Sequence, residues 1–501
     1  MGAALQGVDG VAVEVEVRIS SLLPRVDIVG LPETAVRESS ARVRAAIQTS
    51  GHTFPDRRVT VNLAPAGMRK SGAGLDLPIA LGILAAAAAL EDGALHEVGF
   101  VGELALDGRL RPVRGALSLT LALRDAGCRR VIVPRANFAE AALAPGIRVD
   151  AAADLLELLH HLQTGAPLAP GPAPAHVQPP ASPPDVTDIR GQERAKRALE
   201  VAAAGAHAML MRGPPGAGKT MLARRLPGLL PELAREEAID VTRIHGAAGR
   251  LAAGETISGI RPFRAPHHTA SVAGLLGGGS PPRPGEVSLA HRGVLFLDEL
   301  PEFERRALEG LRQVLEERRV VIARARLSCG FPADFQLLAA ANPCPCGYRQ
   351  SRERECRCDD GAVARYASRI SGPLLDRIDL LVGLPAVPWK KLARPAAGPT
   401  SAELRQRIVA ARRVQARRLR ALGVRVNAEI PDGALDELAA ASPEALTLLG
   451  RAVDRLPLSA RGARRVLRVA RTIADLGNEA RIGPDALAEA LDYRREPAEL
   501  S

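Results

Sequence analysis

The stretch GPPGAGKT, residues 213–220, decides the fold of this chain. It matches the phosphate-loop pattern G-x-x-x-x-G-K-[ST] at every specified position. The apolar run HAMLM precedes it and a helical pattern follows it, and in this strand–loop–helix context backbone N–H groups and the helix N-terminus can surround phosphates. We therefore expect a nucleotide site made by Gly213, Pro214, Pro215, Gly216, Ala217, Gly218, Lys219 and Thr220.

The loop itself and two later apolar runs carry the polar residues that a nucleotide site requires. Lys219 would reach the β- and γ-phosphates of ATP, and Thr220 would hold Mg²⁺. The run VLFLDE ends in Asp298 and Glu299, which we expect to face Mg²⁺ and the attacking water respectively. The next run, QLLAAANP, places Asn342 near the γ-phosphate. Together these residues predict a nucleoside triphosphatase with ATP and Mg²⁺ as cofactors.

Composition and charge limit the class of protein. The 501 residues are 47% hydrophobic and 25% charged, which is typical of a globular protein with several domains. The net charge is +11, and residues 1–163 hold 17 basic and 18 acidic side chains, so the surplus lies in the rest of the chain. It suits a polyanionic partner there, although an arginine-rich proteome is the alternative. The scarcity of aromatic residues argues against a base-stacking platform.

Pattern changes divide the chain into four parts. Mixed strands and helices indicate an α/β domain over residues 1–163, and a Pro/Ala-rich linker follows over 164–185. Strands that alternate with helices predict a mostly parallel sheet over 186–399. Residues 400–501 are nearly all helical, with helices expected at 402–422, 443–456, 460–476 and 484–493.

Within the first part we expect strands at 11–17 and 59–65 and helices at 33–50 and 79–90. The chain start lacks the basic and apolar regions of a signal peptide, and no apolar run reaches the roughly 20 residues of a membrane span. We expect a cytoplasmic protein with no membrane partner.

Residues 261–293 form an irregular insert between the two nucleotide motifs. Its first residues include Arg261, Arg264, His267 and His268, and loops of this kind carry function more often than packing. DNA contact is the preferred interpretation. A nucleotide-sensing or interface role is the alternative.

Two arginines lie where a ring-forming ATPase needs them. Arg377 lies between Asp376 and Asp379, and it fits either an arginine finger that acts on a neighbouring subunit or an ordinary surface ion pair. Arg461 begins a helix in the C-terminal part, where by itself it reads as one exposed arginine among many.

Four cysteines crowd into a short segment: Cys344, Cys346, Cys356 and Cys358. Four thiolates can surround one Zn²⁺, although C-x-C pairs are less usual than C-x-x-C pairs. The alternative is a set of reduced thiols without a metal.

Six stretches together resemble a known family. In chain order they are GPPGAGKT, RPFRAPHHTAS, GEVSLAHRGVLFLDELPEF, AAANPCPCGY, SGPLLDRIDL and SARGARRVLRVARTIADL. Over nearly its whole length the chain resembles the ComM/YifB family of magnesium-chelatase-like AAA+ ATPases. This implies an α/β P-loop ATPase core with a C-terminal helical lid, in which Asn342 is sensor 1, Arg377 the arginine finger and Arg461 sensor 2.

The same resemblance implies a hexameric ring that encircles DNA. Its implied activity is that of an ATP-driven helicase, which promotes branch migration when DNA is integrated during natural transformation. A motor of the magnesium or cobalt chelatase type, remodelling a protein partner, is the alternative. A regulator without enzymatic activity is a third hypothesis, and the intact ATP motifs argue against it.

The first domain resembles the proteolytic domain of Lon, which has the ribosomal S5 domain 2-like fold. Matched to that domain, the serine nucleophile falls near Gly72 or Ala73 and the catalytic lysine falls at Leu119. No lysine occurs in residues 71–163, so the general base of a Lon-type protease is missing. We expect a scaffold or DNA-handling domain without proteolytic activity.

Overall fold

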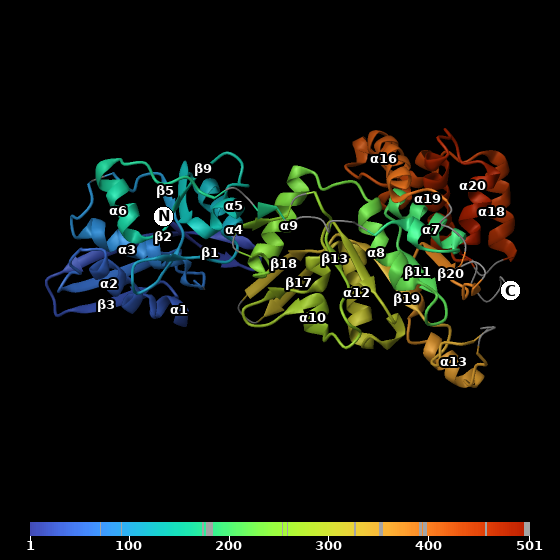
Figure 1. Cartoon of the computed structure of the whole chain (residues 1–501), viewed down its shortest axis with the longest axis horizontal. Coiled ribbons are helices and arrows are strands. Elements are labelled where there is room, and N and C mark those ends of the chain that lie inside the picture. The colour runs from blue at the N-terminus through green and yellow to red at the C-terminus, as the bar shows by residue number, and fades with distance from the viewer. Residues whose placement is uncertain are drawn as a thin grey trace.

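The computed structural model describes the chain apart from residues 71, 92, 173–174, 177–183, 253, 258, 325–326, 350–353, 390–392, 394–397, 456–457 and 495–501. The N-terminal part lies at one end, the sheet that carries the phosphate loop lies in the middle, and the C-terminal helices cover the other end (Figure 1). Much of the expected linker, residues 164–185, falls outside the described residues.

The N-terminal part contains two sheets. The larger has the order β1 (Gly2–Gln6), β2 (Asp9–Ser20), β4 (Arg58–Ala64), β3 (Arg25–Val29), and only the pairing of β3 with β4 is parallel. The smaller is parallel, with the order β5 (Val98–Phe100), β8 (Arg130–Pro134), β9 (Arg148–Ala152). A short hairpin pairs β6 (Glu103–Leu104) with β7 (Leu110–Arg111).

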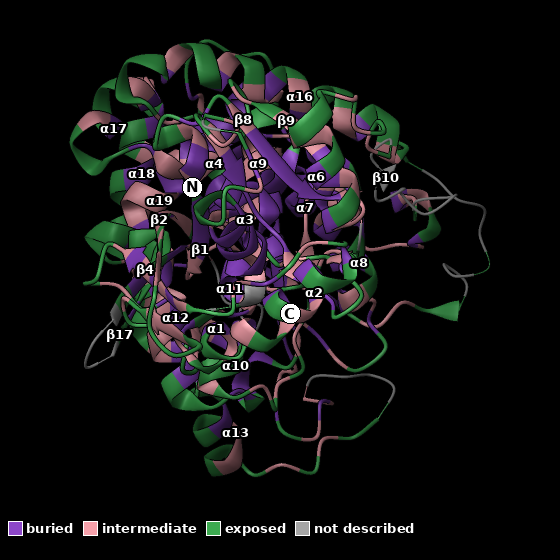
Figure 2. Cartoon of the chain, turned by 90° about the vertical axis from the view of Figure 1, so that its left-hand side faces the viewer, coloured by how far each residue is buried: buried purple, intermediate pink, exposed green. Residues whose placement is uncertain are grey.

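Helices cover these sheets and enclose an apolar interior. They are α1 (Thr34–Arg37), α2 (Ser39–Thr49), α3 (Asp76–Ala86), α4 (Ala116–Asp125), α5 (Phe138–Ala141) and α6 (Leu155–Thr164). Val59, Val61 and Leu63 alternate along β4 as fully buried residues, as expected for a strand with one face on a core. Figure 2 looks onto this end of the molecule, where buried residues gather in the interior and exposed ones around the rim.

Two helix predictions in this part were wrong in their bounds. The helix expected at 33–50 is interrupted at Glu38, which separates α1 from α2. The helix expected at 79–90 begins at Asp76 and ends at Ala86. Asp76 is buried and accepts two hydrogen bonds from Arg42, at 2.7 and 3.0 Å. The ion pair with Arg42 therefore keeps a carboxylate buried at the start of α3.

The middle part is built on a five-stranded parallel sheet. Its order is β13 (Phe263–Arg264), β16 (Val294–Leu297), β19 (Gln336–Ala341), β11 (Met209–Arg212), β20 (Leu380–Gly383). Every residue of β16 and β19 is buried, as expected for a parallel sheet covered on both faces. This confirms the predicted α/β class, and it places β19 directly between the strand of the phosphate loop and the strand of Asp298.

Eight helices and two hairpins accompany this sheet within the described residues. The helices are α7 (Glu193–Gly205), α8 (Lys219–Leu229), α9 (Arg235–Ala247), α10 (Val272–Leu276), α11 (Glu286–Leu289), α12 (Arg305–Glu317), α13 (Asp360–Ala367) and α14 (Gly372–Leu375). The hairpins pair β14 (Gly277–Gly278) with β15 (Arg283–Pro284), and β17 (Arg319–Arg324) with β18 (Leu327–Pro332).

The C-terminal part is a helical lid. It contains α16 (Ser401–Arg418), α17 (Asp432–Ala439), α18 (Pro443–Arg455), α19 (Ala460–Leu476) and α20 (Pro484–Asp492). The helix predicted at 460–476 is confirmed at both ends, and the Ser459 hydroxyl caps it by accepting from the Gly462 N–H at 3.0 Å. Helix α17 was not predicted, because a short segment with a glycine at 433 carries little periodic signal.

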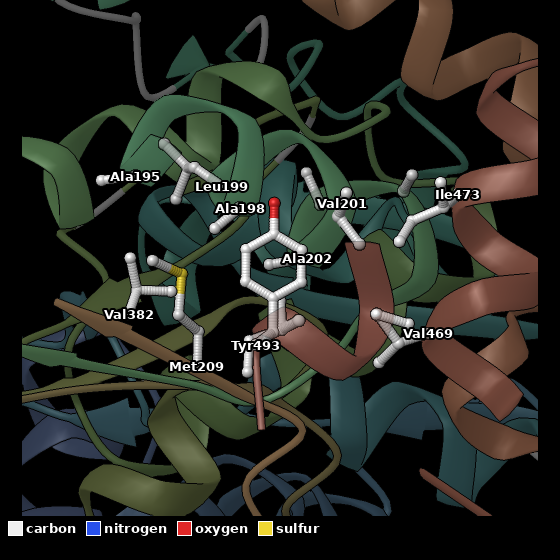
Figure 3. Packing of buried hydrophobic residues seen from close by; sticks show 14 of the residues in the cluster. Ala195, Ala198, Leu199, Val201, Ala202, Met209, Val382, Val469, Ile473 and Tyr493 are labelled. Atoms are coloured by element: carbon white, nitrogen blue, oxygen red, sulfur yellow. The ribbon is translucent and has the colours of Figure 1, made fainter. Parts of the chain in front are cut away.

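Helix α7 joins the sheet to the lid. Its small buried residues Ala198 and Ala202 face the sheet, where Met209 and Val382 lie (Figure 3). On the lid side, the residues in the same cluster are Val469 and Ile473 of α19 and Tyr493. Alanines at this position let sheet and lid approach closely and share one core.

The N-terminal part docks on the middle part through α9. Arg243 forms an ion pair with Asp9 at 2.5 Å, and an apolar cluster spans the boundary with Val8, Ile244, Leu289, Ile322, Cys329 and Phe331. A Cβ on Gly246 would lie 2.4 Å from the Glu140 carboxylate, so α5 and α9 approach closely at this position. A short parallel bridge pairs β10 (Ala175–His176) with β12 (Glu255–Thr256).

Within the described residues, none of the helices combines the length and apolar character needed to cross a lipid bilayer.

The buried Glu140 predicts a pH-dependent stability. Burial raises its pKa from the ordinary 4.5 to about 7, against the opposing hydrogen bond from the Leu117 N–H. The folded chain therefore binds more protons than the unfolded chain between these values, and the free energy of unfolding falls by about 3 kcal/mol as the pH rises from 4.5 to 7. Glu140→Gln removes this titration, so its apparent melting temperature should fall less than that of the wild type between pH 5 and pH 7.5. Glu91→Gln, at an exposed position, is the matched control, and equal pH profiles for Glu140→Gln and the wild type would contradict the prediction.

Candidate functional site

The phosphate loop connects β11 to α8 and depends on its glycines. Gly216 and Gly218 have φ angles of +80° and +91°, in the region that only glycine adopts easily. A Cβ on Gly213 would lie 2.3 Å from the Leu384 carbonyl oxygen. The loop can therefore take this shape only with glycine at these positions, and its N–H groups and the start of α8 form a ready anion site.

Lys219 lies over this loop. Its Nζ donates to the carbonyl oxygens of Gly213 at 2.6 Å and Pro214 at 3.0 Å, and to Asn342 Oδ1 at 3.0 Å. Burial lowers the pKa of Lys219, and the nearby carboxylates of Asp298 and Glu299 offset part of that effect. The structure thus brings together the lysine, the predicted sensor and the loop.

Asp298 and Thr220 form an oxygen pair suited to Mg²⁺. The Thr220 hydroxyl donates to Asp298 Oδ2 at 2.8 Å, although 78 positions separate the two residues. Magnesium prefers hard oxygen ligands of this kind together with phosphate oxygens. Glu299 follows in a left-handed conformation with φ +53°, and its half-exposed carboxylate is accessible to a water molecule.

The basic insert divides into an anchored base and an exposed tip. Arg261 forms an ion pair with Glu237 at 2.9 Å and Arg264 forms one with Glu286 at 2.6 Å, so both guanidinium groups are held within the chain. His267 is exposed, and its ring lies 4.1 Å from that of His268. DNA contact by these four residues stays a prediction.

His268 links the insert to the nucleotide site. Its Nδ1 lies 3.1 Å from Glu299 Oε2. Sequence reasoning missed this contact, because the two residues are far apart in the chain and neither pattern points to the other.

Arg377 and the phosphate loop lie at opposite ends of two neighbouring strands. Arg377 precedes β20, which runs parallel to β11, whereas the loop follows β11, so a strand length of roughly 10 Å separates the two. Its guanidinium pairs with Glu316 and donates to the Pro373 carbonyl at 2.6 Å. The lid fixes its backbone, because Arg465 donates to the Arg377 carbonyl at 3.1 Å and to Asp379 at 2.7 Å.

Arg461 belongs to the same side of the molecule as Arg377. Arg461 is exposed in the first turn of α19. The pKa of Arg377 is lowered by the burial of Arg377 itself and by the positive charges of Arg312 and Arg461, which places these charges near one another. Arg377 and Arg465 also line a cavity of about 270 Å³ between the sheet and the lid. Within one chain the structure does not bring Arg377 or Arg461 to Lys219.

The four clustered cysteines meet in space and form what we term the cysteine knuckle: Cys344, Cys346, Cys356 and Cys358. Their sulfur atoms all lie within 4.8 Å of one another, and the three distances among the first three are 3.4, 3.7 and 3.6 Å. The Arg349 N–H donates to Cys344 Sγ at 3.3 Å, so this sulfur is also oriented by the backbone. The knuckle can therefore hold a metal ion.

Tyr366 is a second site residue that sequence reasoning missed. It is 6% exposed on α13, and its side chain lies close to the Asn342 backbone. Burial raises the pKa of Tyr366 to about 12, so the hydroxyl keeps its proton. No motif marks a single tyrosine of this kind.

These contacts define a P-loop nucleotide site, and comparison with known proteins places it in a family. Models of the magnesium chelatase subunit ChlI match residues 185–392, 15–137 and, for its C-terminal part, 398–494. The chain is 43% identical to the uncharacterized protein YifB of Escherichia coli and 42% identical to the competence protein ComM of Haemophilus influenzae, in each case over 98% of this chain and 96% of the relative. An uncharacterized protein of Mycobacterium tuberculosis is 44% identical over 99% of this chain and 98% of its own length. The chain therefore belongs to the ComM/YifB family of magnesium-chelatase-like AAA+ ATPases.

The likeness to Lon is also present. Lon protease 2 of Bacillus subtilis is 32% identical over 32% of this chain and 32% of its own length. With the mixed α/β model, this supports the predicted fold class of a Lon-like domain before an AAA+ core.

Two substitutions at the nucleotide site should separate binding from hydrolysis. Lys219→Ala removes the cation that would meet the phosphates, so both ATP binding and turnover should be lost. Glu299→Gln keeps the shape of the side chain but removes the carboxylate that would act as the base. ATP binding should therefore persist while turnover falls by about a hundredfold or more. Titration with a fluorescent ATP analogue and a steady-state phosphate-release assay measure the two quantities. Normal turnover in Glu299→Gln would refute the role of this carboxylate.

Proposed function

We propose that the chain is the subunit of an ATP-hydrolysing ring motor that acts on DNA, a helicase that promotes branch migration during recombination and natural transformation. The name of the relative ComM connects that protein with competence, and the near-complete coverage of both chains supports a related role here. Such a motor works on DNA in the cytoplasm.

The contact between His268 and Glu299 is the observation that carries this proposal. His268 belongs to the exposed tip of the basic insert, where we expect DNA, and its ring meets the carboxylate expected to orient the attacking water. A polyanion bound at His267 and His268 would change the surroundings of Glu299. The geometry thus offers a direct route by which DNA alters the rate of ATP hydrolysis.

The position of Arg377 supports a ring of several subunits. One chain holds this arginine a strand length away from its own phosphate loop, so it can act on a nucleotide only if a second copy supplies that nucleotide. Glu316 pairs with the Arg377 guanidinium, which is 8% exposed, and Arg465 holds the Arg377 backbone, so the side chain would have to exchange Glu316 for the neighbour's nucleotide. We infer a homo-oligomer with head-to-tail contacts, and a closed hexamer fits the family.

The cofactors follow from the same residues. Thr220 and Asp298 would hold the Mg²⁺ of bound ATP, which supplies charge neutralisation at the phosphates. The cysteine knuckle would hold Zn²⁺, because four sulfur donors at these separations suit a tetrahedral zinc site.

A motor that remodels a protein partner, as in magnesium or cobalt chelatases, is the second candidate. The family models that match this chain carry the magnesium chelatase name, and the ATP site alone suits both activities. The surplus of positive charge beyond residue 163 favours DNA over this alternative.

Steady-state ATP hydrolysis with and without branched DNA tests the proposal. Forked or three-stranded DNA should raise turnover severalfold at low salt, and the stimulation should weaken as salt increases, because the contact with phosphates releases counterions. Lys219→Ala serves as the blank. No response at any salt concentration would shift the proposal to the protein-remodelling motor.

Mixing two inactive variants tests whether Arg377 acts on a neighbouring subunit. Arg377→Ala should bind ATP but hydrolyse it poorly, and Glu299→Gln should do the same. In a mixed ring, an Arg377→Ala subunit next to a Glu299→Gln subunit forms a complete site, which random mixing gives at about one interface in four. Partial recovery of hydrolysis is the expected result, with each variant alone as control. Absence of recovery in rings shown to be mixed would remove the assignment.

A further inference from the structure

The cysteine knuckle has the dimensions of a single-metal site. Zinc–sulfur bonds of 2.3 Å in a tetrahedron place the sulfur atoms roughly 3.8 Å apart. The three distances of 3.4, 3.7 and 3.6 Å among Cys344, Cys346 and Cys356 agree with that value. An iron–sulfur cluster would need its cysteines further apart, so a single ion fits, and zinc is the metal that structural sites of four cysteines usually hold.

The first cysteines of the knuckle are joined directly to the nucleotide site. Only Pro343 separates Cys344 from Asn342, and Asn342 Oδ1 accepts a hydrogen bond from Lys219 at 3.0 Å. Cys344 is fully buried, so its sulfur and the end of β19 share one packed environment.

The last cysteines return to the same residue. After Cys358 comes Asp359, whose carboxylate caps α13 by accepting from the Ala362 N–H at 2.7 Å. Tyr366 near the far end of α13 lies close to the Asn342 backbone. Both chain segments that leave the knuckle therefore lead back to the surroundings of Asn342.

A third contact joins the knuckle to the phosphate loop itself. The Gly347 N–H donates to the Cys344 carbonyl at 2.9 Å, which closes a tight turn around Cys346. A Cβ on Gly347 would lie 2.7 Å from Cδ of Pro215, and Gly347 has a φ of +85°. Glycine at this position lets the turn pack directly against the phosphate loop.

From these contacts we propose that a zinc ion in the cysteine knuckle positions the nucleotide site, by holding the Gly347 turn against Pro215 and Asn342 against Lys219. This inference rests on the zinc assignment above and on the nucleotide site, but not on action upon DNA. The metal takes no part in the chemistry of hydrolysis. It closes a loop that would otherwise not maintain the shape of the phosphate site.

The test compares metal content with nucleotide affinity in the full chain. The double variant Cys356→Ser/Cys358→Ser removes two sulfur ligands that lie away from Asn342 in sequence. Elemental analysis should find one zinc per chain in the wild type and almost none in the variant. Its Kd for a fluorescent ADP analogue with Mg²⁺ should rise by about tenfold or more, because the loop is no longer held.

The chain offers a matched control. Cys128→Ser/Cys329→Ser also removes two thiols, both buried and outside the knuckle. It should keep its zinc and the wild-type Kd. Removing zinc from the wild type with a chelator should weaken binding as the double variant does, and adding zinc back should restore it, which separates the effect of the metal from misfolding.

Pro215→Ala tests whether the metal affects the nucleotide site through the contact between Gly347 and Pro215. It removes the ring that Gly347 touches, so chelation should change the Kd of this variant less than that of the wild type, as a thermodynamic cycle would report. An unchanged effect of chelation in Pro215→Ala would overturn the proposed contact. Zinc loss without any change in Kd, or iron or no metal in the wild type, would overturn the proposal as a whole. None of these readouts uses DNA, so they stand whether or not DNA stimulates hydrolysis.

Discussion

The parallel hydrogen bonding of β11, β19 and β16 is the constraint on which the nucleotide site depends. Because the three strands run in the same direction, their carboxyl ends lie along one edge, and the residues after them meet. Lys219, Asn342 and Asp298 come from segments far apart in the chain, and the sheet places them around one space. The buried, apolar strands hold this edge rigidly, because each is covered on both faces.

Around that edge, each surrounding part contacts a different residue of the site. The insert contacts Glu299 through His268, and the cysteine knuckle contacts the phosphate loop and Asn342. The lid fixes Arg377 from the other end of the sheet through Arg465. The fold thus separates the residues for binding and hydrolysis within one chain from Arg377, an arrangement suited to a ring in which each nucleotide lies between two subunits.

Two of the arginines of the insert are neutralised by carboxylates of the same chain. Arg261 and Arg264 looked available for DNA in the sequence, but Glu237 and Glu286 hold them at the base of the insert. Net charge alone therefore overstated how much of the insert is open to a polyanion. The exposed His267 and half-buried His268 are the predicted DNA residues that remain at its tip.

The sequence by itself determined the phosphate loop, the two acidic residues, the place of Asn342 after its strand, the α/β class and helix 460–476, because each rests on local periodicity or on a motif of contiguous residues. The break at Glu38, the buried start of α3 at Asp76 and the partners of Arg377 depend on contacts between distant segments, to which local patterns are blind. The same holds for His268 beside Glu299 and for Tyr366 on Asn342. Only the tertiary structure could decide them, since strand order and helix packing, rather than residue spacing, bring these atoms together.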